Sequence, residues 1–156
     1  VLDYGDLVYM NAPAHCLNKL DAAYHSPLRF VTNCKALTHR CTLYAKAGLP
    51  SLTVRRLSHW YTFIYKALLG KLPYYICSLI TQRVASSYCL RSHDVVLLDV
   101  PRARTVLGKT AFMCAAPLAW NNLQQELKLS NLIPLHVFKA RLNEMLADTM
   151  GTCKCL

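Results

Sequence analysis

Residues 53–69 read TVRRLSHWYTFIYKALL, and their apolar side chains follow a helical period. The large apolar residues lie at spacings of four, three and four, at Leu57, Tyr61, Ile64 and Leu68. Positions three and four residues apart share one face of an α-helix. The sequence therefore predicts a helix over 53–69 that buries this stripe as the hydrophobic centre of the fold and ends at Gly70.

Two further helices are expected upstream of this centre. A helical pattern over 13–31 contains Pro27, which lacks a backbone donor, so we expect a kink or break near Tyr24. Thr38 is a good N-cap residue for a short helix, and Gly48 is suited to end it. The upstream part of the chain is therefore predicted to be helical.

Downstream, the pattern predicts three more helices. Pro73 suits the first turn of a short one, because a proline there gives up a donor that would be unpaired anyway. Another is expected over 119–127, and a last one starts at Pro134. We find no internal repeat or linker, so the fold class predicted is a mainly α, small helical domain over 1–156.

Residues 95–116 are expected to depart from this helical pattern. The apolar run at 95–98 suits a buried strand, and Pro101 stops it because proline cannot donate to a ladder. A second apolar run occupies 111–116, and Gly108 can supply a positive φ in the connection. The sequence therefore predicts a short β-hairpin around residues 95–116.

Composition indicates a folded, basic protein. Hydrophobic residues make up 54% of the 156 positions, which is far above the level typical of disordered chains. We find no signal peptide, and charged residues or proline interrupt each apolar run before it is long enough to cross a bilayer. Eight cysteines without a secretory signal indicate reduced thiols in an intracellular setting, nucleus or cytoplasm. Because the chain begins at Val1 and not at Met, we expect a fragment or a processed product.

The positive charge is unevenly distributed. No acidic residue occurs between Asp21 and Asp94, whereas that interval contains ten of the 18 lysines and arginines. Such a field attracts nucleic-acid phosphates and makes their binding salt-dependent, although a solvated basic surface without a partner is the alternative. The candidate nucleic-acid-binding residues are Arg55, Arg56, His59, Lys66, Arg91, Arg102, Arg104 and Lys109.

Aromatic residues accompany these cations. Bases of a single strand stack on exposed aromatic rings, whereas aromatics at helical spacing belong more often to a core. We favour the core for Tyr61 and Trp120. Both interpretations stay open for Trp60, Tyr65, Tyr74 and Tyr75.

Catalytic and metal sites are not expected. Polymerases need clustered carboxylates that hold two metal ions, and the eight acidic residues here are scattered. Tyr4-Gly5-Asp6 is similar to a polymerase motif but lacks the second adjacent aspartate. Cys34, His39 and Cys41 lie close in sequence, yet they lack the paired spacing of strong zinc sites. We therefore predict no catalytic residue, metal or cofactor.

Residues 90–123 contain a series of short motifs. They read LRSHD at 90–94, VPRART at 100–105, GKTAF at 108–112 and APLAWNNL at 116–123. In this order the motifs resemble the C-terminal segment of non-LTR retrotransposon (LINE-type) reverse transcriptase polyproteins, downstream of the palm and thumb. LDYGD at 2–6 and GKLP at 70–73 agree with the same resemblance.

The resemblance implies a non-catalytic part of an RNA-directed DNA polymerase polyprotein. Such a segment would support RNA-templated DNA synthesis by binding template RNA or target DNA. Its partners would be a nucleic-acid backbone and the upstream polymerase domain of the same polyprotein, with no membrane. Two alternatives remain: an α-helical protein-interaction or structural module, and an inactive relic of a decayed element.

Overall fold

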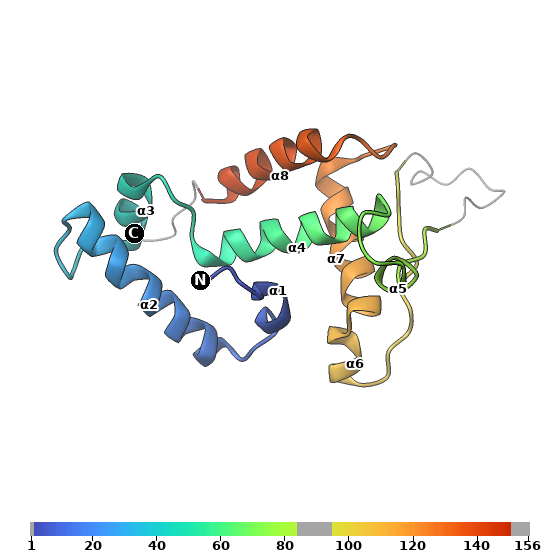
Figure 1. The fold of residues 1–156 in the computed structure, drawn as a ribbon, viewed down its shortest axis with the longest axis horizontal. Coiled ribbons are helices and arrows are strands. Elements are labelled where there is room, and N and C mark those ends of the chain that lie inside the picture. Colours follow the sequence, from blue (N-terminus) through green and yellow to red (C-terminus); the bar gives the residue numbers. More distant parts are fainter. Residues whose placement is uncertain (1, 84–94, 151–156) are drawn as a thin grey trace. The chain divides into compact units, whose positions relative to one another are not determined.

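The computed structural model describes residues 2–83 and 95–150, with side chains up to residue 147 (Figure 1). Within these ranges the chain forms eight helices and no strand, so the mainly α prediction is confirmed. By internal contacts the chain divides into two compact units. The first unit is Val1–Trp60 with Glu144–Leu156, and the second is Tyr61–Asn143. The expectation of one domain over 1–156 stays a prediction.

The first unit contains the first three helices and the start of the fourth. Its core is formed by Tyr24, Leu28 and Leu52, against which the half-buried Leu20 and Tyr44 pack. The Tyr24 hydroxyl donates to the Pro50 carbonyl at 3.1 Å, which ties α2 to the α3–α4 connection. The helices are α1 (Asp6–Tyr9), α2 (Ala14–Thr32), α3 (Arg40–Ala47) and α4 (Leu52–Leu68).

Helix α2 runs without interruption through Pro27, so of the predicted kink or break near Tyr24 the break is wrong. Pro27 lies on the exposed side of α2, as does Ala23, whose carbonyl loses its partner because proline has no N–H. Water can solvate that carbonyl. The opposite side of α2 buries Tyr24 and Leu28 in the core, and this packing maintains the helix.

Helix α3 begins at Arg40, one residue later than it would begin if Thr38 were its N-cap. The N-cap is His39, whose Nδ1 accepts from the Cys41 N–H at 3.3 Å. The C-terminal prediction is confirmed, because Gly48 follows the helix with φ 61°. A left-handed residue at this position lets the chain turn away, and glycine adopts it without strain.

Helix α4 confirms the predicted central helix within one residue, and Gly70 follows it with φ 66°. The predicted stripe, however, is shifted by about one position. Leu57, Tyr61 and Leu68 are half-buried, and of the predicted residues Ile64 alone is fully buried. The buried side of α4 is lined instead by Leu52, Arg56, Trp60, Ile64, Tyr65 and Ala67.

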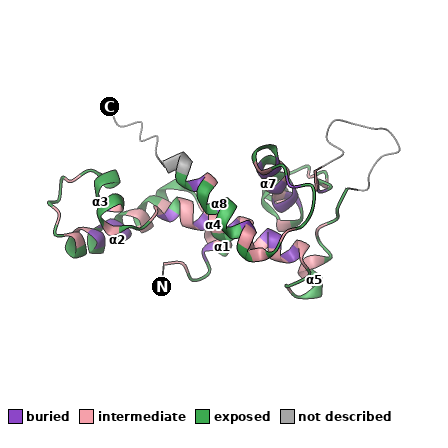
Figure 2. Ribbon diagram, turned by 90° about the horizontal axis from the view of Figure 1, so that it is seen from above, coloured by how far each residue is buried: buried purple, intermediate pink, exposed green. Residues whose placement is uncertain are grey.

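The second unit is organised around three stacked aromatic side chains. Tyr65, Trp120 and Phe138 come from α4, α7 and α8 and are completely buried. The rings of Tyr65 and Phe138 stack with centroids 3.9 Å apart, and Figure 2 shows further buried positions along α7. After α4, this unit contains α5 (Tyr74–Cys77), α6 (Val106–Thr110), α7 (Phe112–Leu127) and the first part of α8 (Leu135–Met150).

The predicted β-hairpin around residues 95–116 is wrong. Residues 95–100 are extended, but the second predicted strand, 111–116, forms the beginning of α7. Backbone groups of the extended segment bond to the Asn121 side chain, the Leu129 carbonyl and the indole of Trp120. The Leu97 carbonyl and the Asp99 N–H pair instead with Arg83 and Thr81, each at 2.9 Å, so these backbone groups have partners without the predicted second strand. One isolated antiparallel bridge joins Gln82 to Leu98.

Candidate nucleic-acid interface

Three of the four predicted basic residues of α4 lie within the first unit, beside carboxylates from the N-terminal part of the chain. Arg55 forms an ion pair with Asp3. Arg56 is buried, with Nη2 3.9 Å from Oδ1 of Asp21. His59 Nδ1 lies 2.5 Å from Oδ2 of Asp6, which is itself buried. Each cationic or basic group therefore already has an acidic neighbour.

These pairs tie α1 and α2 to α4. Arg55 also lies over the ring of Tyr24, with 5.8 Å between guanidinium carbon and ring centroid. Arg56 contacts Thr53 Oγ1 at 3.3 Å in addition to Asp21. Ion pairs of this kind hold side chains in one geometry and reduce the field available to a phosphate. A role of Arg55, Arg56 and His59 in nucleic-acid binding stays a prediction.

Two of these carboxylates and His59 also form a group that could hold a metal ion. Within the described residues, Asp3, Asp6 and His59 place ligand atoms within 4.8 Å of one another. The Arg55 guanidinium bonded to Asp3 repels a cation at this position, so the cluster is better described as an ion-pair network. Cys34, His39 and Cys41 do not come together in a group of this kind among the described side chains.

The second unit carries most of the net positive charge. Residues 61–143 contain ten of the 18 lysines and arginines but three of the eight acidic residues, so they contribute +7 of the formal +10. Among the described residues of this unit, one ion pair is present, between Arg83 Nε and Asp99 Oδ1 at 3.5 Å. The excess of cations over carboxylates leaves a positive field for an anionic partner.

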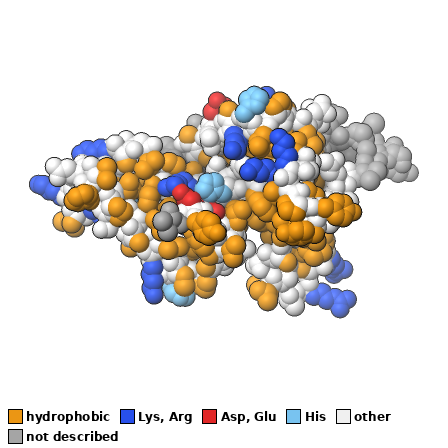
Figure 3. Space-filling view, viewed as in Figure 1, with side chains coloured by type: hydrophobic (Ala, Val, Ile, Leu, Met, Phe, Trp, Pro, Cys, Tyr) orange, Lys and Arg blue, Asp and Glu red, His pale blue; other side chains and the backbone are white. Residues whose placement is uncertain are grey.

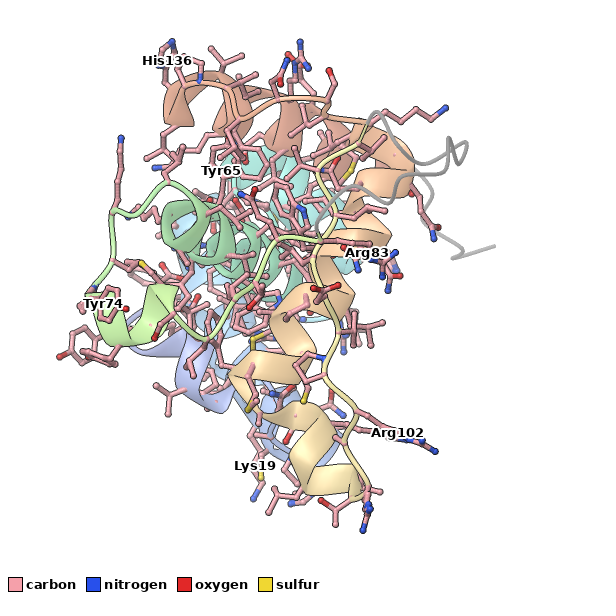
Figure 4. The ribbon with its side chains drawn as sticks, turned by 90° about the vertical axis from the view of Figure 1, so that its right-hand side faces the viewer. Lys19, Tyr65, Tyr74, Arg83, Arg102 and His136 are labelled. Atoms are coloured by element: carbon pink, nitrogen blue, oxygen red, sulfur yellow. The ribbon has the colours of Figure 1, made fainter. Side chains whose placement is uncertain are left out.

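The segment 102–109 presents three of the predicted cations. Arg102, Arg104 and Lys109 are exposed, and in the described part of the chain none of them has a carboxylate within ion-pair distance. Figure 3 shows basic side chains projecting at the α6 end of this unit, and in Figure 4 Arg102 points away from the ribbon. We call these three side chains the α6 basic cluster.

Local hydrogen bonds hold the α6 basic cluster in place. Thr105 is the N-cap of α6, and its hydroxyl accepts from the Gly108 N–H at 3.0 Å. Gly108 does not supply the positive φ that was predicted, because it lies inside the helix. A Cβ at Gly108 would stand 3.0 Å from Thr105 Oγ1 and 3.4 Å from the Ala103 side chain. Any larger residue at this position would therefore push the Thr105 side chain aside by a few tenths of an ångström.

The remaining predicted residues occupy different environments. Lys66 is half-buried on α4, and Arg91 lies outside the described residues. Of the aromatic candidates, Trp60, Tyr65 and Trp120 are buried, which confirms the core interpretation for Trp120. Tyr74 and Tyr75 are 87% and 70% exposed, and Tyr74 points outward in Figure 4. These two tyrosines are accessible for base stacking.

A pocket in the second unit was not predicted from the sequence. Its lining includes Arg83, Gln124 and Lys128, which are distant in the chain. Arg83 precedes the extended segment, whereas Gln124 and Lys128 stand at the C-terminal end of α7. No sequence motif connects them, because only the packing of the extended segment against α7 brings them together.

Comparison with known proteins adds no family assignment. No protein-family model matches the chain, and neither a curated protein nor a solved structure shows significant similarity to it. Within the described residues, no helix combines the length and the apolar character that crossing a membrane demands.

Proposed function

We propose that this chain binds the backbone of a nucleic acid through the α6 basic cluster of its second unit. The protein is then a non-catalytic C-terminal part of a LINE-type reverse transcriptase, where it holds template RNA or target DNA beside the upstream polymerase domain. The motif order over 90–123 supports the family, and the charge distribution supports the binding role.

The observation that carries the proposal is the contrast between two sets of cations. Arg55 and Arg56 are ion-paired with Asp3 and Asp21, whereas Arg102, Arg104 and Lys109 are exposed without such partners among the described residues. When a phosphate binds an exposed cation that has no carboxylate partner, counterions are released from the strand, and no existing ion pair of the protein has to be broken. Backbone contacts of this kind position a strand without reading its sequence.

The direct test is filter binding of the whole chain to a single-stranded RNA at several salt concentrations. We expect retention at low salt that falls steeply as salt rises. The double variant Arg102→Glu, Arg104→Glu should weaken retention strongly, because it replaces two attractive contacts with two repulsive ones. The matched control is Lys19→Glu, Lys35→Glu, which changes the net charge equally at exposed positions of the first unit.

Two results would defeat the proposal. Retention that does not depend on salt would exclude an electrostatic backbone contact. Equal losses in the two double variants would show that overall net charge, and not the α6 basic cluster, attracts the RNA. Both variants should first give the circular dichroism spectrum of the parent chain, because the substituted side chains are exposed.

A second function is favoured by exposed apolar residues in the first unit. Phe30, Val31 and Leu37 are 88%, 77% and 99% exposed around the C-terminal end of α2. Contiguous exposed apolar surface is typical of protein-interaction sites. Light scattering that shows a defined oligomer, together with absence of RNA retention, would favour an α-helical interaction module over the proposal.

A further inference from the structure

Helix α6 exposes two adjacent apolar side chains among the cations of the α6 basic cluster. Val106 and Leu107, the first two residues of the helix, are each 82% exposed. Arg102 and Arg104 precede this pair in the chain, and Lys109 follows it. Figure 3 shows hydrophobic and basic side chains next to each other at the α6 end of the unit. An exposed apolar pair enclosed by cations indicates a partner that is anionic and can also bury apolar groups.

The backbone that carries this pair is held by local hydrogen bonds. Thr105 Oγ1 accepts from the Gly108 N–H at 3.0 Å, and the Thr110 hydroxyl donates to the Leu107 carbonyl at 2.7 Å. The Lys109 N–H donates to the Thr105 carbonyl at 3.2 Å. An apolar side chain that separates stacked bases has to work against their restacking, and a backbone fixed in this way supports it.

The charge and the length of α6 distinguish between possible partners. Charged residues are depleted from the centre of protein–protein interfaces, whereas here three cations surround two apolar residues. Many helices that lie in a membrane surface are about 20–30 residues long, and α6 has five residues. DNA-bending proteins, by contrast, insert single apolar side chains such as leucine between base pairs from the minor groove, with basic side chains around them.

We infer that the α6 end of the second unit binds duplex DNA through the minor groove and inserts Leu107 between two base pairs. Val106 lies against the edge of the opened step, and Arg102, Arg104 and Lys109 contact the phosphates beside it. The bend that insertion produces brings more of the strand against the protein. The inference deepens the proposed function and rests on it: of the two nucleic acids named there, it selects target DNA.

The residues of this segment suit duplex DNA better than RNA. Single-stranded RNA is typically bound by bases that stack on aromatic side chains, and residues 102–111 contain none. Double-stranded RNA has a wide, shallow minor groove that proteins recognise by its shape and its 2′-hydroxyl groups. Pyrimidine–purine steps of DNA, such as TA, unstack most readily, so a TA step is the expected point of insertion.

The test uses the whole chain and a short DNA duplex that has one central TA step. The duplex carries a fluorophore at each end and 2-aminopurine beside the step. Fluorescence anisotropy measures binding, energy transfer between the two fluorophores measures bending, and the emission of 2-aminopurine measures unstacking. We expect the chain to bend the duplex by about 20–90° and to increase the emission of 2-aminopurine.

The variant Leu107→Ala separates insertion from electrostatic attraction. Bending and unstacking should be lost and the affinity should fall about tenfold, because an apolar contact is removed. The slope of log affinity against log salt should equal that of the parent, since no charge changes. Leu107→Met keeps a long apolar side chain and should retain bending. Both residues favour a helix, and Leu107 is exposed, so both variants should fold as the parent does.

The matched control is Val8→Ala, which shortens an apolar side chain that is 89% exposed in the first unit. It should change neither the affinity for the duplex nor the bending. A general loss of apolar surface would affect this control as much as Leu107→Ala, whereas insertion depends on Leu107 alone.

Four outcomes would overturn the inference. They are binding of the duplex without bending, bending that persists in Leu107→Ala, tighter binding of single-stranded RNA than of the duplex, and retention on vesicles of phosphatidylcholine and phosphatidylserine that Leu107→Ala abolishes while DNA stays unbent. Salt-dependent binding of RNA and DNA without bending would reject insertion alone and leave the backbone contact of the proposed function. Absence of binding to either nucleic acid would reject the proposed function itself.

Discussion

Tyr65 shows how one hydroxyl contributes to the second unit. It donates to the Ile133 carbonyl at 2.5 Å and accepts from the Ile133 N–H at 2.7 Å, so it satisfies both backbone groups of one residue. The ring is fully buried and packs against both Trp120 and Phe138. Burial also raises the pKa of the Tyr65 hydroxyl, which therefore stays protonated and able to donate.

Tyr65→Phe should lower the free energy of unfolding by about 1–3 kcal/mol, because two partly buried backbone groups of Ile133 lose their partner. Tyr61→Phe is the matched control one helical turn earlier, since Tyr61 is half-buried and has no hydrogen bond within the described structure. We expect the control to change stability by less than about 0.5 kcal/mol. Urea denaturation measures both, and equal effects would contradict this account of Tyr65.

A buried histidine is expected to make the first unit less stable in acid. His25 Nε2 lies 2.5 Å from the Tyr44 hydroxyl, and the imidazole is buried. Burial, and then the charge of Arg40, lower the pKa of His25 below its ordinary value. The unfolded chain therefore binds a proton at His25 more readily than the folded chain does. Stability from this residue is complete above the unfolded pKa, about 6.5, and is lost as pH falls.

We expect the free energy of unfolding to decrease between pH 7 and pH 5, as measured by urea denaturation. His25→Gln should reduce this pH dependence, since glutamine can bond to Tyr44 but does not titrate. His136→Gln removes an exposed histidine of α8 and should preserve the full pH dependence. An unchanged slope in His25→Gln would assign the acid sensitivity to other groups.

At the scale of elements, α7 replaces the strand that the sequence predicted. Asn121 on α7 accepts from the Leu98 N–H and donates to the Leu98 carbonyl, each at 2.9 Å, as a neighbouring strand would. The Trp120 indole adds a bond to the Val96 carbonyl at 2.8 Å. The apolar run at 95–98 predicted a buried strand, and Leu98 is indeed buried, but such a run cannot reveal that a helix supplies hydrogen-bond partners to its backbone.

Asn121→Ala should release the extended segment from α7. Both hydrogen bonds to Leu98 are lost, so we expect a decrease of about 1–3 kcal/mol in stability and faster amide exchange at Leu98. Asn122→Ala, at the adjacent and exposed position, is the control and should leave exchange at Leu98 unchanged. Slow exchange at Leu98 in Asn121→Ala would show that Asn121 does not hold the segment.

At the scale of the whole molecule, charge and pairing differ between the two units. The second unit carries +7 of the formal +10. In the first unit, residues far upstream in sequence, Asp3 and Asp21, pair with Arg55 and Arg56. Two of the ten cations in the interval without acidic residues, 22–93, are therefore paired in the folded protein with carboxylates from outside that interval.

This difference predicts distinct salt dependences of RNA binding. Arg102→Gln, Arg104→Gln should reduce the slope of log affinity against log salt by about 0.7 for each lost contact, or about 1.4 in all. Arg55→Gln should leave the slope unchanged, because this guanidinium is engaged by Asp3. A slope reduced in Arg55→Gln as well would establish Arg55 as a phosphate contact, as the sequence first suggested.

The sequence by itself determined α2, α3, α4 and α8 and most of their ends, whereas α1 and α6 were not predicted and the beginning of α7 was predicted as a strand. Spacing of three and four residues defined α4, and Gly48 and Gly70 ended α3 and α4 because a left-handed turn there suits glycine. These are local properties, in which residues within one or two turns decide the conformation.

Only the tertiary structure decided which charges are neutralised and which residues line the pocket of the second unit. The pairing of Arg55 with Asp3 spans 52 residues, and the pocket around Gln124 combines segments that lie apart in the chain. Electrostatic and hydrogen-bond partners act over a few ångströms in space, whereas a sequence records only neighbours along the chain. The basic composition was therefore evident from the sequence, but the position of the free cations was not.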